Sequence, residues 1–345
     1  MRARRPGFPK TLIEFQRRFS TEEACEAYLA ECRWPDGFRC PRCGHGTAWV
    51  LSARRLRECA ACGYQASTTA GTILHRTRTP LVVWFWAAYL MITDKRGFSA
   101  LALQRQLGVA RYETAWMILH KLRRATVNAN RTKLRGTVEV DEAWIGGVQA
   151  GATGRTRHGR NAALVVLALE VGVGDGFPGR LRIRLVPDDT ADSLVGFVQE
   201  AVEVGSTVIT DGWTAYLALP EAGFIHERTV EGSGEHFINS VPHLHHTIGN
   251  LKAWLAGTHK GVSRQHLAAY LDEFVFRHNR RHNLAAAFQT LLGLGTTRDP
   301  TTYETITGAK DIPAVPYTLS QKQAGTRRRR KRFVPAAPTP GAANP

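Results

Sequence analysis

Residues 138–147 read Val-Glu-Val-Asp-Glu-Ala-Trp-Ile-Gly-Gly, an apolar run that carries three acidic residues and ends at a Gly-Gly turn. This pattern predicts a β-strand, and strand alternation places Glu139, Asp141 and Ala143 on one face. Glu142 then points to the opposite face. A carboxylate within a core strand is costly unless it meets a partner or a metal ion. Asp141 is therefore the first candidate for a functional acid.

Further β-rich runs follow with glycine punctuation, and helical patterns accompany them. The order β-β-β-α-β-α indicates an α/β fold with a mixed sheet flanked by helices. The predicted strands cover residues 137–145, 161–171, 181–186 and 206–210, and the predicted helices cover residues 190–203, 243–256 and 263–279.

A second acid, Asp211, follows the apolar run of residues 207–210 and precedes Gly212 and Trp213. It falls at the carboxyl edge of the predicted sheet, where α/β sheets commonly hold ligands. Two carboxylates from different strands can bridge two Mg²⁺ ions, one activating an attacking hydroxyl and the other stabilising a leaving oxygen during phosphoryl transfer. An isolated Asp-Gly is more often a turn, so the pairing with Asp141 carries this interpretation.

A third group of polar residues lies in the helical pattern of residues 242–255, which holds His243, His245 and His246. His245 and Lys252 are seven residues apart, which is about two helical turns, so both can face one groove. A neutral imidazole can ligate a metal ion while the lysine contacts a phosphate. The alternative is that the three histidines form a polar helix face or bind an adventitious transition metal.

Four cysteines have the spacing of a structural zinc site: Cys40 and Cys43, then Cys59 and Cys62, each pair separated by two residues. Four thiolates give the closed tetrahedral shell of structural Zn²⁺, which leaves no open position for catalysis. His45 is expected to be exposed and not a ligand. Arginines and aromatic residues around the cysteines fit a DNA-contacting face, and they fit a solvated face almost as well.

Residues 80–130 carry the pattern of three helices, and the last two resemble a helix-turn-helix. Ser99 begins the first of this pair, a Leu-Gly-Val turn ends it, and the second helix covers residues 112–127. The second helix of such a motif enters the DNA major groove. An ordinary helical hairpin is the alternative. The residues expected to face DNA are Arg111, Thr114, His120 and Lys121.

The chain has 345 residues, 46 of them Lys or Arg against 29 Asp or Glu, giving a net charge of +17. This excess favours a nucleic-acid partner, although part of it lies in the run of residues 327–332. The basic first ten residues are not followed by a secretory apolar stretch, and the apolar run 81–92 is too short for a bilayer. We therefore expect a soluble, cytoplasmic protein without a membrane partner, in which Cys25 and Cys32 are buried thiols.

Together these blocks resemble the bacterial insertion-sequence transposases of the fifteen-ninety-five family, also described as ISXO-type. The resemblance runs from about residue 21 to residue 293 and includes the cysteine pairs, the helix pair, Val-Asp-Glu-x-x-x-Gly-Gly and Asp-Gly-Trp. It also includes residues 257–261, Gly-Thr-His-Lys-Gly, and residues 270–281, Tyr-Leu-Asp-Glu-Phe-x-Phe-Arg-x-Asn-Arg-Arg.

This resemblance implies a ribonuclease-H-like catalytic domain that cuts and joins DNA at the terminal inverted repeats of its own element. It implies two catalytic Mg²⁺ or Mn²⁺ ions held by Asp141 and Asp211. The family usually has a glutamate seven residues before a lysine, and this chain has His245 there, so the third role passes to His245 with Asn250 as its rival. Imidazole is a softer ligand and relaxes the preference towards Mn²⁺.

The resemblance also implies double-stranded DNA as partner, at least a homodimer on two DNA ends, and a nucleoid-associated location in a bacterium. A DNA-binding regulator with an inactive catalytic domain is the alternative function, and a nuclease acting on an RNA-DNA hybrid is a third. The expected domains are an N-terminal helical segment (1–35), a zinc ribbon (36–75), a helix-turn-helix region (80–130), the catalytic domain (136–293) and a basic, Pro/Ala-rich tail (318–345).

Overall fold

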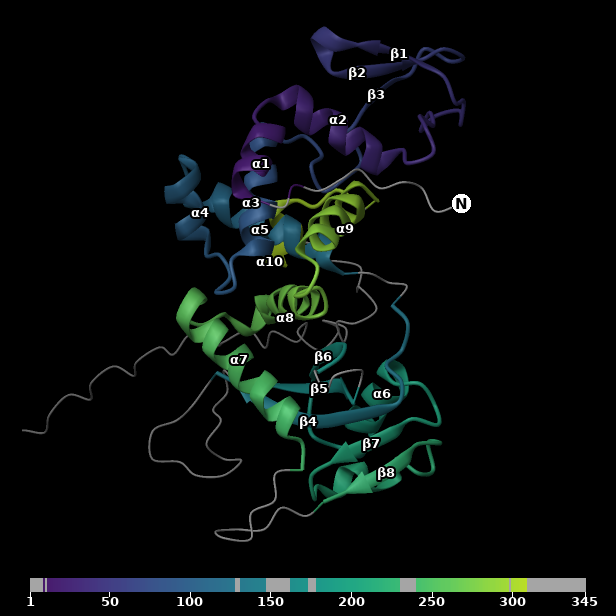
Figure 1. The fold of residues 1–345 in the computed structure, drawn as a ribbon, viewed down its shortest axis with the longest axis vertical. Coiled ribbons are helices and arrows are strands. Elements are labelled where there is room, and N and C mark those ends of the chain that lie inside the picture. The colour runs from purple at the N-terminus through teal and green to yellow at the C-terminus, as the bar shows by residue number, and fades with distance from the viewer. Residues whose placement is uncertain are drawn as a thin grey trace, which may run out of the picture.

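The computed structural model describes residues 9, 11–127, 131–146, 162–172, 178–229, 240–297 and 299–308. Figure 1 shows a three-stranded ribbon and a group of helices above a five-stranded sheet that is flanked by further helices. The predicted tail 318–345 with its basic run, Asn161 at the start of the second predicted strand, and Gly147 lie outside the described residues.

The chain begins with two short helices, α1 (Leu12–Arg18) and α2 (Glu22–Arg33). Each starts at a threonine, Thr11 or Thr21, whose side chain accepts an amide of the first turn and so caps the helix. The ribbon follows as an antiparallel sheet in the order β1-β2-β3. Its strands are β1 (Ala48–Leu51), β2 (Leu56–Cys59) and β3 (Gln65–Ser67), with the short helix η1 (Ser52–Arg54) between the first two.

Three helices occupy the stretch in which three were predicted: α3 (Leu81–Thr93), α4 (Ala100–Leu107) and α5 (Tyr112–Thr126). Ser99 caps α4 by accepting the amide of Ala102, and Gly108 ends it in the left-handed conformation. The apolar run that forms α3 is buried among other helices. No helix within the described residues has both the length and the apolar character needed to cross a bilayer.

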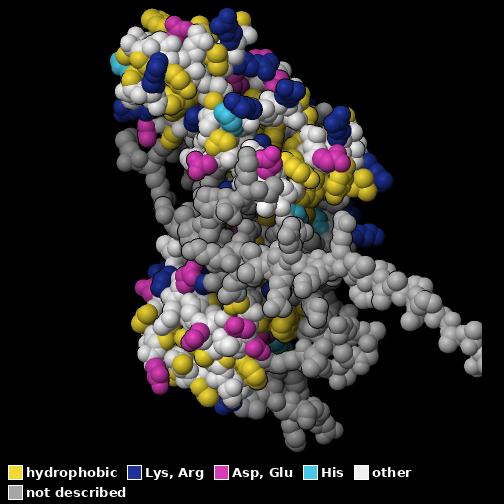
Figure 2. Space-filling view, turned by 180° about the vertical axis from the view of Figure 1, so that it is seen from behind, with side chains coloured by type: hydrophobic (Ala, Val, Ile, Leu, Met, Phe, Trp, Pro, Cys, Tyr) yellow, Lys and Arg dark blue, Asp and Glu magenta, His cyan; other side chains and the backbone are white. Residues whose placement is uncertain are grey.

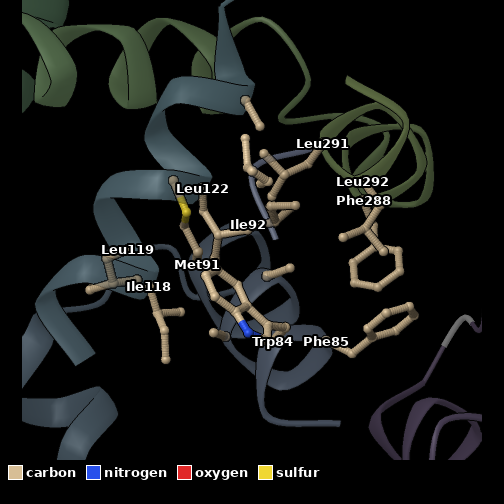
Figure 3. Close-up of a cluster of buried hydrophobic side chains, with 14 of the residues drawn as sticks. Trp84, Phe85, Met91, Ile92, Ile118, Leu119, Leu122, Phe288, Leu291 and Leu292 are labelled. Atoms are coloured by element: carbon tan, nitrogen blue, oxygen red, sulfur yellow. The ribbon is translucent and has the colours of Figure 1, made fainter. Parts of the chain in front are cut away.

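The first five helices share one hydrophobic core with a helix from the far end of the chain, α9 (Leu284–Thr297). Figure 3 shows Phe288, Leu291 and Leu292 of α9 beside side chains of α3 such as Phe85 and Ile92. We call this group the helical unit. No helix was predicted for residues 284–297, and a short last helix, α10 (Tyr303–Thr307), follows α9.

The five-stranded sheet has the order β6-β5-β4-β7-β8. β4 pairs antiparallel with β5, and β5 pairs antiparallel with β6, whereas β4 and β7, and β7 and β8, pair parallel. This mixed sheet confirms the α/β fold class. Its strands are β4 (Thr137–Ile145), β5 (Ala163–Val171), β6 (Leu181–Val186), β7 (Thr207–Thr210) and β8 (Ile225–Arg228), of which β8 was not predicted.

Helices cover both faces of the sheet, because alternate residues of its central strands are apolar on each side. α6 (Ala191–Ala201) and η3 (Thr214–Ala218) pack on the face that holds Val138 and Val140. α7 (Pro242–His259) and α8 (Arg264–His278) pack on the opposite face, which holds Ala143. We call the sheet with these helices the sheet unit. Its second face is the one predicted to carry Glu139 and Asp141.

Candidate active site and zinc site

The four cysteines of the ribbon come together as the spacing predicts. The sulfur atoms of Cys40 and Cys62 lie 3.7 Å apart, those of Cys43 and Cys59 lie 3.5 Å apart, and all four lie within 4.8 Å of one another. Four sulfurs at about 2.3 Å from a tetrahedral zinc ion lie roughly 3.8 Å from each other. The cluster therefore fits a structural Zn²⁺ ion.

Local backbone geometry explains why each cysteine pair is followed by a glycine. The amide of Gly44 donates to the carbonyl of Cys40, and the amide of Gly63 donates to the carbonyl of Cys59, at 2.9 and 3.0 Å. Both glycines have positive φ, 76° and 66°, which residues with a Cβ rarely adopt. The two turns are thus copies of one knuckle, and each aims two sulfurs at the same point. His45 is exposed, as expected.

The helix pair exposes part of the predicted DNA-facing set. Arg111 is exposed and Thr114 is partly buried. Lys121 is also partly buried, with its ammonium nitrogen 5.9 Å from the ring centre of Trp84. The prediction for His120 is wrong, because only 2% of its surface is exposed. Helical periodicity places it on the face of α5 that packs against α8, where its ring stacks 3.9 Å from that of Trp116.

Asp141 of β4 and His245 of α7 are in direct contact. Nε2 of His245 lies 3.2 Å from Oδ2 of Asp141, and the other carboxylate oxygen accepts the amide of Glu142 at 2.8 Å. The Asp141 side chain is largely buried and the His245 side chain is 36% exposed. The imidazole is therefore open to solvent on one side and in contact with the carboxylate on the other.

Asp211 lies at the end of β7, the parallel neighbour of β4. The register pairs Thr137 with Thr207 and Glu139 with Ile209, and Asp141 and Asp211 each come two residues after this last pair. One carboxylate oxygen of Asp211 accepts the amide of Trp213 at 2.9 Å, which fixes the Asp-Gly-Trp turn at the sheet edge. Asp141 thus lies in β4, and Asp211 directly follows β7, the strand that pairs parallel with β4.

The spacing of Asp141 and His245 suits two ligands of one divalent ion. Neighbouring ligands of an octahedral ion at about 2.1 Å lie roughly 3 Å apart, and the 3.2 Å contact between Asp141 and His245 matches this spacing. Among the described residues, only the cysteine cluster has three or more donor atoms all within 4.8 Å. Asp141, Asp211 and His245 therefore do not all lie within that limit of one another.

The two remaining predicted residues of α7 are exposed. Lys252 is seven residues after His245 and therefore on the same side of the helix, whereas Asn250 is five residues after it and turned away by about 140°. No contact of either residue with Asp141 or Asp211 is present among the described residues. The geometry brings His245, and not Asn250, to the acids.

A buried carboxylate that the sequence analysis left without a role anchors this helix. Oε2 of Glu139 accepts the amide of Leu244 at 2.6 Å, in the first turn of α7, one residue before His245. Burial raises the pKa of Glu139, while this amide and His243 act in the opposite direction. Glu139 therefore holds the start of α7 against β4. In the sequence, the position of Glu139 two residues before Asp141, on the same strand face, could have suggested this role.

On the opposite face of β4, Glu142 accepts a hydrogen bond at 2.9 Å from the hydroxyl of Tyr216 in η3. Tyr216 is fully buried. Burial, followed by the negative charges of Glu142, Asp141 and Asp211, raises the pKa of this phenol well above its usual value. The phenol thus stays protonated beneath the acidic site. No local motif marks Tyr216 in the sequence, so its role could be found only from the fold.

Two family models match the chain. A transposase zinc-ribbon domain matches residues 20–65, and an ISXO2-like transposase domain matches residues 133–279. The first contains all four cysteines, and the second contains Asp141, Asp211 and His245. The second match ends at Asn279, before α9, whose apolar side chains pack in the helical unit.

A curated relative from Halobacterium salinarum is described as an uncharacterized protein in the transposable element ISH50. It is 27% identical over 297 residues, which cover 79% of this chain and 98% of the relative. The similarity therefore extends beyond the two matched domains. The chain thus combines two domains that match models of insertion-sequence transposases, a transposase zinc ribbon followed by an ISXO2-like transposase domain.

Proposed function

We propose that this protein is a DNA transposase that binds the terminal inverted repeats of its insertion sequence and catalyses metal-dependent strand cleavage and strand transfer. The observation that carries the proposal is the contact of His245 with Asp141 in β4, together with the position of Asp211 directly after β7, the parallel neighbour of β4. These three potential ligands come from three separate elements and support a metal site at this edge of the sheet.

In this proposal Asp141, Asp211 and His245 hold two Mg²⁺ or Mn²⁺ ions. Bound there, the ions would activate the attacking hydroxyl and stabilise the leaving oxygen of an in-line displacement. Lys252 contacts a phosphate of the DNA from the same side of α7. His245 supplies a softer ligand than a carboxylate, so Mn²⁺ is expected to support the reaction better than Mg²⁺.

Double-stranded DNA is the proposed partner of the ribbon and of α4 and α5. In Figure 2, Lys and Arg side chains are frequent over the upper part of the molecule, where Asp and Glu also occur, and few Lys or Arg side chains are seen over the coloured lower part. Cationic surface on the DNA-reading units supplies affinity for the phosphate backbone. Because an insertion sequence has two DNA ends, its transfer is proposed to use at least a homodimer. The proposed target is nucleoid DNA in the cytoplasm.

The test is joining of a labelled DNA end that carries the terminal repeat, in Mg²⁺ and in Mn²⁺. We expect metal-dependent joining by the wild type, and loss of joining but not of repeat binding in Asp141→Ala and His245→Ala. The matched control is Asp192→Ala, because Asp192 is an exposed acid on α6 and is not one of the proposed ligands. Binding without cleavage by the wild type in either metal would instead support a DNA-binding regulator.

A further inference from the structure

One helix, α8, belongs to both parts of the molecule. Its Leu271 and Val275 pack in the core between the sheet and α7, while Phe276 packs in the core of the helical unit. Between them Glu273 forms a buried ion pair with Arg123 of α5, with 2.7 Å between Nε and Oε2. The side chains are 1% and 0% exposed, so the second helix of the helix-turn-helix is tied directly to the sheet unit.

Polar and aromatic side chains surround this ion pair. The Arg123 guanidinium lies 3.8 Å from the ring centre of Tyr270, and Arg277 lies 3.8 Å from Glu273. Burial, followed by the positive charge of Arg123, lowers the pKa of His120 to about 2 and that of His259 to about 3. Both histidines are therefore neutral. We call seven residues the interdomain cluster: His120, Arg123, Trp254, His259, Tyr270, Glu273 and Arg277.

The interdomain cluster is not a tightly satisfied network. Six of its buried polar atoms have no hydrogen-bond partner within the described chain, one each on His120, Arg123, Trp254, His259, Glu273 and Arg277. A buried ion pair contributes less net stability than apolar packing of similar volume would, because both charges lose their hydration. The cluster is therefore better suited to fixing an arrangement than to stabilising the fold.

A second set of contacts joins the same helices to the turn between α3 and α4. Arg277 donates to the carbonyls of Asp94 and Lys95, and Thr258 donates to the carbonyl of Arg96. Gly97, with φ of 75°, lies so close that a Cβ there would stand 2.2 Å from Nε1 of Trp254. The turn that leads into the helix-turn-helix is thus held against the end of α7.

α7 connects these contacts to the candidate active site. His245 lies in its first turns beside Asp141, and Trp254 and Thr258 lie in its last turns beside the α3–α4 turn. A helix of 18 residues is about 27 Å long, so α7 is one continuous element between these two places.

We propose that the interdomain cluster and the docked α3–α4 turn hold the DNA-reading helices in a fixed position relative to Asp141 and Asp211. This determines which phosphodiester of a bound DNA end reaches the acids. Arg123, Glu273 and Arg277 are then positioning residues, and they give a role to the Tyr-Leu-Asp-Glu-Phe-x-Phe-Arg block of residues 270–277. The choice of phosphodiester rests on the proposed transposase function, whereas the fixed position of the helices does not. We call the first the DNA consequence of the proposal and the second its structural consequence.

The structural consequence is tested without DNA, by measuring the distance between labels at Tyr112 on α5 and Leu217 in η3, which are 47% and 55% exposed. The labels are carried by non-canonical amino acids, because cysteine labelling would compete with the zinc site. We expect one narrow distribution for the full-length wild type and a broadened or shifted one for Arg277→Gln and for Gly97→Ala. Arg96→Gln is the matched control, because its side chain is 89% exposed and only its carbonyl joins the contact.

The DNA consequence is tested by mapping the cut in a labelled end with the same four proteins. A misplacement of about 1 Å at a reacting centre lowers a rate on the order of 100-fold, so Arg277→Gln and Gly97→Ala should lose the main cut by that factor and cut neighbouring phosphodiesters. Affinity for the repeat should match that of Arg96→Gln. A merely stabilising role would lower the amount of active protein without moving the cut.

The outcomes separate the two proposals. If both variants keep the wild-type distance distribution, the positioning proposal is overturned, whatever the DNA assay gives. If the distances change but the cut stays at one phosphodiester, its DNA consequence is overturned. If the wild type binds the repeat and cuts nothing, the transposase function fails, and the distance measurement still decides whether the cluster fixes the two units.

Discussion

The zinc site and the candidate catalytic site differ in how their ligands are brought together. The four cysteines lie within 23 positions of sequence, on two copies of one turn, and their sulfurs are all within 4.8 Å. Asp141, Asp211 and His245 come from β4, the end of β7 and α7, and Asp141 and His245 are in direct contact. A closed shell made from local turns suits a structural ion, whereas an open set made by the tertiary fold leaves positions for substrate oxygens.

This difference has a consequence for stability. The ribbon has three short strands, and within residues 36–67 only Ala66 and two of the cysteines are buried apolar residues, so we expect it to depend on its ion. The sheet that carries the acids is covered by two apolar cores and does not need an ion to fold. Metal removal should therefore unfold one region and leave the other folded.

Removal of zinc has the largest expected effect. Structural Zn²⁺ contributes about 10–16 kcal/mol to the folding of small zinc modules. We expect Cys59→Ser to lose the single bound zinc and to become sensitive to protease within residues 36–75, while the sheet unit stays resistant. Cys32→Ser is the control, because that cysteine packs partly against the helical core. Full zinc content in Cys59→Ser, measured by mass spectrometry, would show that the cluster is not the site.

Loss of a catalytic acid should leave the structure intact and affect only the reaction. A metal-bound carboxylate supports several kcal/mol of transition-state stabilisation, so Asp211→Asn should slow DNA joining about a thousandfold or more. Zinc content and the thermal unfolding midpoint should not change. Asp192→Asn provides the comparison at an exposed acid. Joining at near the wild-type rate by Asp211→Asn would remove this residue from the site.

The interdomain cluster should lose stability in acid. The pKa values of His120 and His259 are lowered to about 2 and about 3 in the folded chain, chiefly by burial. In the unfolded chain a histidine has a pKa of about 6.5, so below that pH the unfolded state takes up protons that the folded state does not. The free energy of unfolding is therefore highest above about pH 6.5 and falls as the pH drops, by up to about 2 kcal/mol per histidine at pH 5. Arg123, Arg277 and His266 add positive charge nearby, and Glu273 opposes them.

Urea unfolding at pH 7 and pH 5 measures this effect. The variant His120→Gln should lose less stability between the two values than the wild type does, by up to about 2 kcal/mol. Acid also protonates the zinc thiolates, but it does so in both proteins, so the difference between them isolates the histidine. Equal losses in the two proteins would mean that His120 does not remain neutral and buried.

The smallest expected effect belongs to Glu139. Glu139→Gln keeps an acceptor for the amide of Leu244 but exchanges a charge-assisted hydrogen bond for a neutral one, at a cost of about 1 kcal/mol. Because that amide precedes His245, we also expect weaker Mn²⁺ binding. Glu221→Gln, at an exposed acid, is the matched control. Calorimetric titration that finds equal Mn²⁺ affinity in the two variants would show that Glu139 does not position His245.

Much of the fold could be predicted because its signals are local. β4 and β6 have the predicted bounds, since their apolar residues are flanked by glycines or turns, and the zinc site follows from cysteine spacing alone. β8 was missed because Ile225 to Arg228 form a polar, largely exposed edge strand without an alternating apolar pattern. α9 was missed although it is apolar, and sequence alone does not tell which core such a helix joins.

The parts of the site that could not be predicted depend on contacts between distant segments. Glu139 and Leu244 are 105 positions apart, and Tyr216 and Glu142 are 74 positions apart. His120 was placed on the DNA side because the amphipathic pattern of α5 marks a buried face without saying which neighbour covers it. Strand alternation did predict that Glu139 and Asp141 share a face, and the contacts of both residues with α7 confirm this.

The most direct test of the catalytic site asks whether Asp141, Asp211 and His245 share bound metal. Zinc-loaded protein is supplied with Fe²⁺, ascorbate and peroxide, so that radicals formed at the iron cut the polypeptide nearby, and the cuts are mapped by mass spectrometry. We predict three groups of cuts, near residues 141, 211 and 245, all suppressed by excess Mn²⁺ and all absent in Asp141→Ala. Cuts confined to the histidines at the start of α7 that persist in Asp141→Ala would contradict the account.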